Sequence, residues 1–198
     1  MEHINQSLFL LINAAPDASG IVVEIAKFIA DFLIWIVPLG LIIAWFRGGN
    51  ATRQVMVAAT LAGVLALLIN QLISVVWYHP RPFEMGIGKT LIAHVQDSSF
   101  PSDHLTLIWA MAFNFLLHKH QQRVGGFLLL SGIPVAWARI YLGVHFTLDI
   151  IGGALVGLIS AWVIFRIERR LLPTLMGILL RSYRTLFSGL IRNGWVRK

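Results

Sequence analysis

Five long apolar runs constrain most strongly what this chain can fold into. They cover residues 21–46, 55–77, 102–117, 124–142 and 146–165. A helix needs about 20 apolar residues to cross the hydrocarbon core of a bilayer, and only helices satisfy the backbone hydrogen bonds of an open chain there. We therefore predict an all-α fold, a polytopic membrane bundle of five transmembrane helices. The third run is short for a full span.

The composition supports this class of protein. Hydrophobic residues make up 57% of the chain and charged residues 13%, whereas a soluble domain carries about 25% charged residues. Lys and Arg that flank membrane helices explain the net charge of +7 better than nucleic-acid binding does. The sequence contains no cysteine, which excludes disulfides, thiol catalysis and thiolate zinc sites.

The chain is predicted to be a single membrane domain, residues 1–198, in three parts. Residues 1–18 form an N-terminal interfacial segment with a short helix over 3–13, and Glu2 stands where a cleaved signal peptide would be basic. Residues 19–170 hold the helical bundle, in which Gly153 and Gly157 are spaced for close helix packing. Residues 171–198 intersperse apolar side chains with Arg, which predicts a C-terminal amphipathic helix on the cytoplasmic surface rather than a sixth span.

The basic residues indicate how the bundle is oriented. Alternating spans place twelve of the sixteen Lys and Arg on one face, namely Arg47, Arg53, Lys119, Arg123, Arg166, Arg169, Arg170, Arg181, Arg184, Arg192, Arg197 and Lys198. Basic residues are enriched on the cytoplasmic side of membrane proteins. We therefore expect a multi-pass protein of the inner (cytoplasmic) membrane whose N-terminus lies outside.

Three polar clusters fall on the predicted outer face, each at the end of a span. They are Arg81-Pro82, then Pro101-Ser102-Asp103-His104, and finally Arg139 with His145 and Asp149. Taken alone, Ser102 is an ordinary helix N-cap and Asp149 an ordinary charge at a helix start. Their occurrence together on one membrane face is harder to explain without a function, because ionisable groups near the membrane are costly.

Together the clusters contain the parts of a phosphoryl-transfer site. Two arginines offer charged forks that match phosphate oxygens, and Ser102 at a helix start adds donors for an anion. Asp149 lies one helical turn after His145 and can hold one imidazole nitrogen while the other attacks. His104 is available as the acid for the leaving oxygen. The set requires neither a metal nor a cofactor.

These motifs resemble the three-part signature of the type 2 phosphatidic acid phosphatase (PAP2) superfamily. Residues 99–104 and 139–145 are similar to its bacterial undecaprenyl-pyrophosphate phosphatase branch. The resemblance implies an undecaprenyl-diphosphatase facing the periplasm, which recycles the lipid carrier of cell-wall synthesis and confers tolerance to bacitracin. It also implies roles for the residues: His145 forms a phosphohistidine, Asp149 orients it, His104 is the acid, and the phosphate is bound by Arg81, Ser102, Arg139 and the backbone of Asp103.

The sequence departs from the family pattern at three positions. Ser74 stands where the first motif has lysine, Asp103 where the second has glycine, and Ala138 where the third has serine. Glu24, Lys27 and Asp31 are spaced to lie near one face of the first helix. We consider that Lys27 replaces the missing cation by reaching the outer pocket, the alternative being a self-contained ion pair buried between helices. His79 and His94 lie on the same face and are candidates for lining the substrate entrance.

Other functions remain open from the sequence. The nearest are a phosphatidate or phosphatidylglycerophosphate phosphatase and a lipid phosphotransferase, since a phosphohistidine can pass its phosphate to acceptors other than water. A lipid-binding or transport protein without chemistry is the non-enzymatic alternative. The expected partners are the polyprenyl diphosphate and membrane lipids, and the sequence does not define an oligomeric state.

Overall fold

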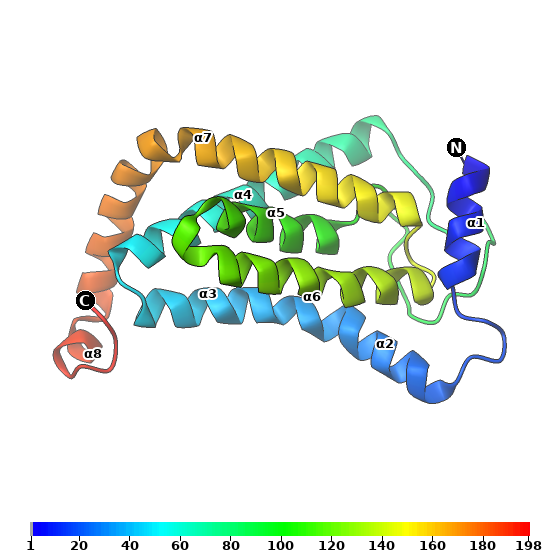
Figure 1. The fold of residues 1–198 in the computed structure, drawn as a ribbon, viewed down its shortest axis with the longest axis horizontal. Coiled ribbons are helices and arrows are strands. Elements are labelled where there is room, and N and C mark those ends of the chain that lie inside the picture. The colour runs from blue at the N-terminus through cyan, green and yellow to red at the C-terminus, as the bar shows by residue number, and fades with distance from the viewer. Residues whose placement is uncertain (1) are drawn as a thin grey trace.

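The computed structural model describes residues 2–198, and every regular element within that range is a helix. Four helices form the body of the molecule: α4 (Asn50–Val76), α5 (Asp103–Leu117), α6 (Gln122–Tyr141) and α7 (Thr147–Leu186). Helix α5 packs against each of the other three and is enclosed by them (Figure 1). The all-α membrane fold predicted from the apolar runs agrees with this architecture.

Small residues let the helices approach α5 closely. A Cβ at Gly153 of α7 would lie 2.9 Å from Thr106 Oγ1, and one at Gly157 would lie 2.8 Å from the Ala110 backbone nitrogen. Both distances are too short for a real side chain, so only glycine allows α7 to lie this near α5. The predicted close packing through these two glycines is confirmed. It fixes the position of α7 along α5.

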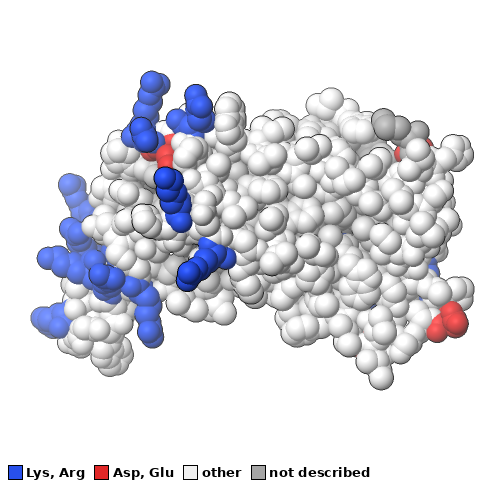
Figure 2. Space-filling view, viewed as in Figure 1, with Lys and Arg blue, Asp and Glu red and all other residues white. Residues whose placement is uncertain are grey.

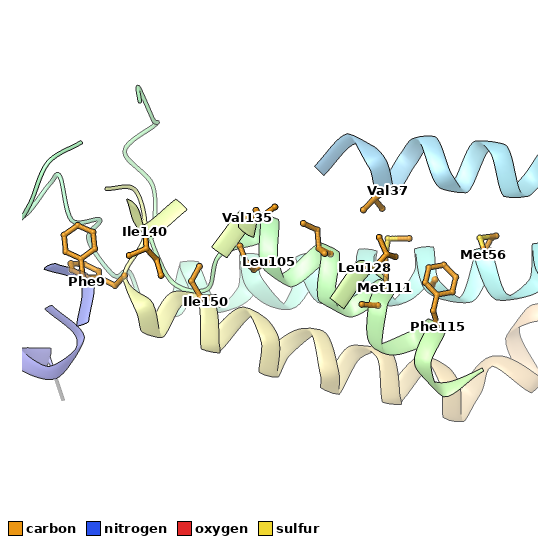
Figure 3. Packing of buried hydrophobic residues seen from close by; sticks show 14 residues of the cluster. Phe9, Val37, Met56, Leu105, Met111, Phe115, Leu128, Val135, Ile140 and Ile150 are labelled. Atoms are coloured by element: carbon orange, nitrogen blue, oxygen red, sulfur yellow. The ribbon is translucent and has the colours of Figure 1, made fainter. Parts of the chain in front are cut away.

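The largest apolar cluster fills the space between the helices along their length (Figure 3). Leu105, Met111 and Phe115 of α5 contribute its centre, and each is at most 2% exposed. Phe9, Ile140 and Ile150 lie at the end where the polar clusters fall. Apolar packing therefore continues up to the outer end of the bundle and fixes the helix ends that carry the polar residues.

The first predicted span is a broken helix. It consists of α2 (Gly20–Phe32), a 3₁₀ turn η1 (Leu33–Trp35) and α3 (Ile36–Arg47). Pro38 follows the break within the first turn of α3, where a missing backbone N–H removes no hydrogen bond of that helix. Helix α6, by contrast, runs without interruption through Pro134.

At the outer end, α1 (Glu2–Ile12) closes the bundle as the predicted N-terminal helix. Phe9 is fully buried with its ring centroid 5.2 Å from that of Phe146. Asn5 Oδ1 accepts a hydrogen bond of 3.0 Å from the backbone N–H of Leu148, near the start of α7. Helix α1 thus braces the turn that leads into α7.

At the inner end, the sequence predicted a separate amphipathic helix over residues 171–198. The structure instead joins most of this tail to α7. Helix α7 continues without a break from residue 147 to residue 186, with Pro173 inside it, and changes direction in its last third (Figure 1). The shorter helices η2 (Lys119–Gln121) and α8 (Ser188–Arg192) complete the described chain. Leu172, Met176 and Tyr183 of the final turns are buried. Packing on the bundle therefore carries the helix past the position where the sequence suggested a boundary.

Four helical segments within residues 2–198 are long and apolar enough to cross a membrane, and they cover residues 20–47, 50–76, 119–141 and 147–186. Helix α5 is apolar but has only 15 residues. Lys and Arg gather at the end of the molecule that holds the C-terminus (Figures 1 and 2). The protein is thus a multi-pass helical membrane protein with one strongly basic end.

Candidate active site

The three polar clusters meet at the end of the bundle opposite the basic tail. A cavity of about 170 Å³ opens there between the ends of α4, α5 and α6 and the turn before α7. It is lined by eleven residues: Gln71, Ser74, Arg81, His94, Asp97, Ser98, Pro101, Asp103, His104, Arg139 and His145. The structure therefore brings both predicted arginines and both predicted catalytic histidines to one cavity.

His145 lies in the tight turn that joins α6 to α7. Gly143 has a φ of +82° and passes so close to the Lys89 carbonyl that a Cβ would lie 2.2 Å from its oxygen. Glycine at this position is required by both the conformation and the space. The turn places His145 at the floor of the cavity, where its side chain is 2% exposed.

The partners of His145 determine its tautomer. Nδ1 lies 3.0 Å from the backbone carbonyl oxygen of Ser99 and 3.4 Å from Asp149 Oδ2. A carbonyl oxygen only accepts, so Nδ1 carries the proton and Nε2 keeps its lone pair. Burial, together with the nearby Arg139 and Arg81 guanidinium groups, lowers the pKa of His145 to about 4. The ring is therefore neutral at neutral pH, with its free nitrogen available for attack.

Asp149 is held firmly below the ring. Its Oδ2 accepts hydrogen bonds from the backbone N–H of Phe146 at 2.7 Å and from the hydroxyl of Ser99. Asp149 itself is fully buried. The predicted orientation of His145 by Asp149 is thus shared with Ser99, whose carbonyl is the nearer acceptor. Ser99 lies in the second motif but was not singled out from the sequence.

Arg81 contacts the Nε2 atom of His145, the nitrogen predicted to attack. Its Nη1 donates to the Val144 carbonyl oxygen at 2.8 Å and lies 3.3 Å from His145 Nε2. Its Nε donates to Asp97 Oδ1 at 2.8 Å. The contact with Nε2 agrees with the tautomer inferred above, since a guanidinium can only donate. A phosphate held by this guanidinium lies within reach of the attacking nitrogen.

Arg139 reaches the cavity from the last turn of α6 and is 3% exposed. Its Nη2 donates to His94 Nε2 at 2.9 Å, while its buried Nε has no hydrogen-bond partner. A buried guanidinium donor without a partner is costly. The second predicted phosphate ligand therefore has an unused donor in the ligand-free protein.

The start of α5 brings the second motif to the site. Ser102 precedes the helix and is fully buried, and its hydroxyl has no hydrogen-bond partner. Asp103 Oδ1 accepts from Asn70 Nδ2 of α4 at 2.7 Å. His104 follows and lines the cavity, whereas Ser102, a predicted phosphate ligand, is not among the lining residues. The hydroxyl of Ser102 is thus an unused donor like Arg139 Nε.

Two other candidates lie elsewhere. Lys27 pairs with Glu24 at 2.8 Å on a largely exposed face of α2 and does not line the cavity. Lys27 is thus not a replacement for the missing motif lysine. Its ion pair is self-contained as the alternative predicted, but it is exposed and not buried between helices. His79 packs against Phe146 with its Nε2 3.7 Å from Glu2 Oε2, and it also lies outside the lining residues.

Five lining residues, Gln71, Ser74, His94, Asp97 and Ser98, were not assigned to the site from the sequence, although His94 was a candidate for its entrance. Gln71 and Ser74 come from the end of α4, and the other three come from the loop between α4 and α5. Within residues 2–198, no three His, Asp or Glu side chains are grouped in a way that could hold a metal ion.

Comparison with known proteins finds relatives in sequence and in fold. YbjG of Escherichia coli (strain K12), to which undecaprenyl-diphosphatase activity is assigned provisionally, is 39% identical over 197 residues, 100% of this chain and 99% of YbjG. The undecaprenyl-diphosphatase BcrC of Bacillus subtilis (strain 168) is 30% identical and covers 96% of both chains. The crystal structure of Aquifex aeolicus LpxE superimposes with a TM-score of 0.68 at 24% identity, over 82% of this chain and 95% of LpxE.

The family model of the PAP2 superfamily matches residues 54–173. This range includes all three polar clusters and every residue that lines the cavity. The resemblance predicted from the motifs is thereby confirmed. The chain belongs to the PAP2 superfamily.

Proposed function

We propose that the protein hydrolyses undecaprenyl diphosphate to undecaprenyl phosphate and inorganic phosphate through a phosphohistidine on His145. The observation that carries this proposal is the meeting of His104 and His145 with Arg81 and Arg139 around one cavity. The two full-length relatives with this activity in their names support the choice of substrate. By recycling the carrier lipid, the enzyme would reduce the diphosphate that bacitracin sequesters.

In the first step, Arg81 and Arg139 hold the terminal phosphate over His145. The Nε2 lone pair attacks the phosphorus, and the bond from phosphorus to the bridging oxygen breaks. The bonding electrons stay on that oxygen, which takes a proton from His104 and leaves as undecaprenyl phosphate. The positive charge that develops on the His145 ring is stabilised at Nδ1–H by the Ser99 carbonyl and Asp149.

In the second step, water replaces the lipid. His104, now neutral, takes a proton from a water molecule, and the resulting hydroxide attacks the phosphorus of the phosphohistidine. The bond between Nε2 and phosphorus breaks, which restores the lone pair of His145 and releases phosphate. His104 ends the cycle protonated, so protons and charge balance. The same arginines stabilise the phosphoryl oxygens in both transition states.

The size of the cavity supports recognition of the headgroup alone. Its volume of about 170 Å³ is below the roughly 300–1,000 Å³ of sites that enclose a whole drug-sized ligand. The polyprenyl tail then remains in the lipid or between helices. We further propose that α5 is the fifth crossing, shortened because the site is set below the outer surface, and that the site faces the periplasm from the inner membrane. The concentration of Lys and Arg at the other end supports this orientation (Figure 2).

Phosphate release by the purified protein in detergent tests the proposal. The wild type should release phosphate from undecaprenyl diphosphate with a chelator present, and His145→Ala should release none. His118→Ala is the matched control. His118 pairs with Glu168 at 3.1 Å near the inner end of the bundle and does not line the cavity. Release that persists in His145→Ala would exclude the phosphohistidine, and loss of activity in chelator would indicate a metal enzyme.

The same assay separates the alternative functions. Faster turnover of phosphatidate or phosphatidylglycerophosphate than of the polyprenyl diphosphate would move the protein to another substrate class. Transfer of labelled phosphate to an added lipid alcohol would identify a phosphotransferase. A lipid-binding or transport protein would release no phosphate from any of these substrates.

A further inference from the structure

The charges around the cavity do not suit a diphosphate when all histidines are neutral. Two cationic residues, Arg81 and Arg139, line it, and so do two anionic residues, Asp97 and Asp103. These four formal charges cancel, yet the substrate of the proposed reaction carries several negative charges. Relative to the family pattern, serine at 74 removes a positive charge and aspartate at 103 adds a negative one. Proton uptake by an imidazole is the remaining source of positive charge.

The cavity has three imidazoles, one more than the mechanism uses. His145 must keep its lone pair to attack, and the proton of His104 goes to the leaving oxygen. His94, in the loop between α4 and α5, is the third. Its ring centroid lies 6.3 Å from that of His145, so it stands beside the position of the reacting phosphate.

The hydrogen bonds of His94 show which ring nitrogen carries a proton and which one can gain a proton. Nδ1 lies 3.0 Å from the Val95 carbonyl oxygen, so Nδ1 carries the proton. Nε2 then accepts from Arg139 Nη2 at 2.9 Å. Burial lowers the pKa of His94 below its ordinary value, and the charges of Arg81 and Arg139 lower it further. In the ligand-free protein, His94 is therefore a neutral acceptor that occupies a donor of Arg139.

We propose that His94 is a substrate-binding residue that takes up a proton at Nε2 when the diphosphate enters and so adds a positive charge to those of Arg81, Arg139 and the protonated His104 of the mechanism. This inference rests on the proposed function. A phosphate oxygen replaces Nε2 as the acceptor of Arg139 Nη2. His94 then donates from Nε2–H to the substrate, so Arg139 Nη2 and His94 Nε2, which were bonded to each other, both donate to the diphosphate.

Charged and titratable groups face His94 from every side of the cavity. Arg139 approaches from α6, and Arg81 and Asp97 from its own loop, with Asp97 Oδ1 3.8 Å from Nδ1. His104 and Asp103 approach from α5, and His145 from the turn before α7. In the empty cavity the two arginines oppose protonation. The bound diphosphate outweighs them, because it places negative charge directly at Nε2.

The pH dependence has a defined sign. Between the low pKa of His94 in the free protein and its higher pKa in the complex, binding takes up one proton at this residue. In that range the dissociation constant rises about tenfold for each unit of increasing pH through this group. Above the pKa in the complex, His94 stays neutral in both states and binding remains weak.

Binding of farnesyl methylenediphosphonate, whose P–C–P bridge resists hydrolysis, tests the inference by calorimetry in detergent. Measurements in two buffers of different ionisation enthalpy give the number of protons taken up. His94→Gln keeps an acceptor for Arg139 but cannot gain a proton. We expect it to bind about tenfold more weakly near neutral pH, to take up about one proton fewer, and to raise KM for undecaprenyl diphosphate far more than it lowers kcat.

Two further variants sharpen the test. His79→Gln changes a histidine of the same loop outside the cavity and should bind and take up protons as the wild type does. Ser74→Lys supplies a permanent charge from α4 on the cavity wall. In the His94→Gln background it should restore affinity without restoring proton uptake. Alone, it should reduce proton uptake, a result that does not depend on the folding of the His94 variant.

The possible failures are distinguishable. If the wild type releases no phosphate, or His145→Ala still does, the proposed function fails. If turnover requires His145 but His94→Gln binds the analogue and takes up protons as the wild type does, only the role of His94 is wrong. Weaker binding of His94→Gln with unchanged proton uptake would also overturn the proposal. It would show that His94 only positions Arg139 and does not take up the proton.

Discussion

The two ends of the bundle use buried arginine in opposite ways. At the inner end, fully buried Arg53 donates to the carbonyl oxygens of Trp45 at 2.9 Å and Arg197 at 2.6 Å, and it lies over the ring of Tyr183 at 4.4 Å. At the outer end, Arg81 and Arg139 face a cavity that three histidines also line. Burial of arginine is thus not in itself a sign of function. The groups that the guanidinium contacts separate the two roles: Arg53 contacts carbonyls and aromatic rings, whereas Arg81 and Arg139 also contact imidazole nitrogens at a cavity.

Arg81→Lys tests the outer end and should cause the largest loss of activity in this series. Lysine keeps the charge but has no second nitrogen, whereas Arg81 contacts Val144 and His145 through Nη1 and Asp97 through Nε. We expect kcat/KM for undecaprenyl diphosphate to fall about 100- to 1,000-fold, as when a preorganised donor to a transition state is lost. Steady-state kinetics measure the loss, and an unchanged melting temperature would assign it to chemistry rather than folding. A loss below tenfold would contradict the proposed position of the phosphate.

Arg53→Met tests the inner half and should act on stability. It removes a buried cation that joins the start of α4 to the C-terminal segment through Arg197 and Tyr183. Loss of these hydrogen bonds should destabilise the protein by about 3 kcal/mol, seen as a lower melting temperature and faster proteolysis after residue 186. The kcat of the folded fraction should stay within a factor of two. A selective loss of kcat would show that the inner end is coupled to the site.

The sequence predicted the inner and outer ends unequally well. Periodic apolar runs defined the spans, and the motif residues Arg81, His104, Arg139 and His145 do meet, because helix ends on one membrane face are brought together by packing. His94 and Asp97 escaped assignment because they lie in an irregular loop with no period to place them. The extent of α7 beyond residue 165 was missed because Arg residues suggested a boundary, whereas Leu172, Met176 and Tyr183 hold the helix on the bundle.

The acid limb of the activity profile probes the outer end without mutation. Burial and the two arginines lower the pKa of His145 to about 4. The ring therefore stays neutral when the pH falls below the ordinary pKa of histidine. Below about pH 4, protonation of Nε2 should reduce kcat/KM tenfold per pH unit. An acid limb near pH 6.5, corrected for ionisation of the substrate, would mean that the cavity does not desolvate His145.

Ser99→Ala should have the smallest effect of this series. It separates the contribution of the Ser99 hydroxyl to the orientation of His145 from that of the Ser99 carbonyl. The variant removes the hydroxyl that donates to Asp149 Oδ2 but keeps the Ser99 carbonyl 3.0 Å from Nδ1 and the Phe146 N–H that binds the same carboxylate. Since the nearer acceptor and the correct tautomer remain, we expect kcat to fall only about tenfold. Asp149→Asn in parallel should cost more, because it removes the negative charge that stabilises the phosphorylated ring. If Ser99→Ala equals Asp149→Asn, the hydroxyl rather than the carbonyl is what aligns the nucleophile.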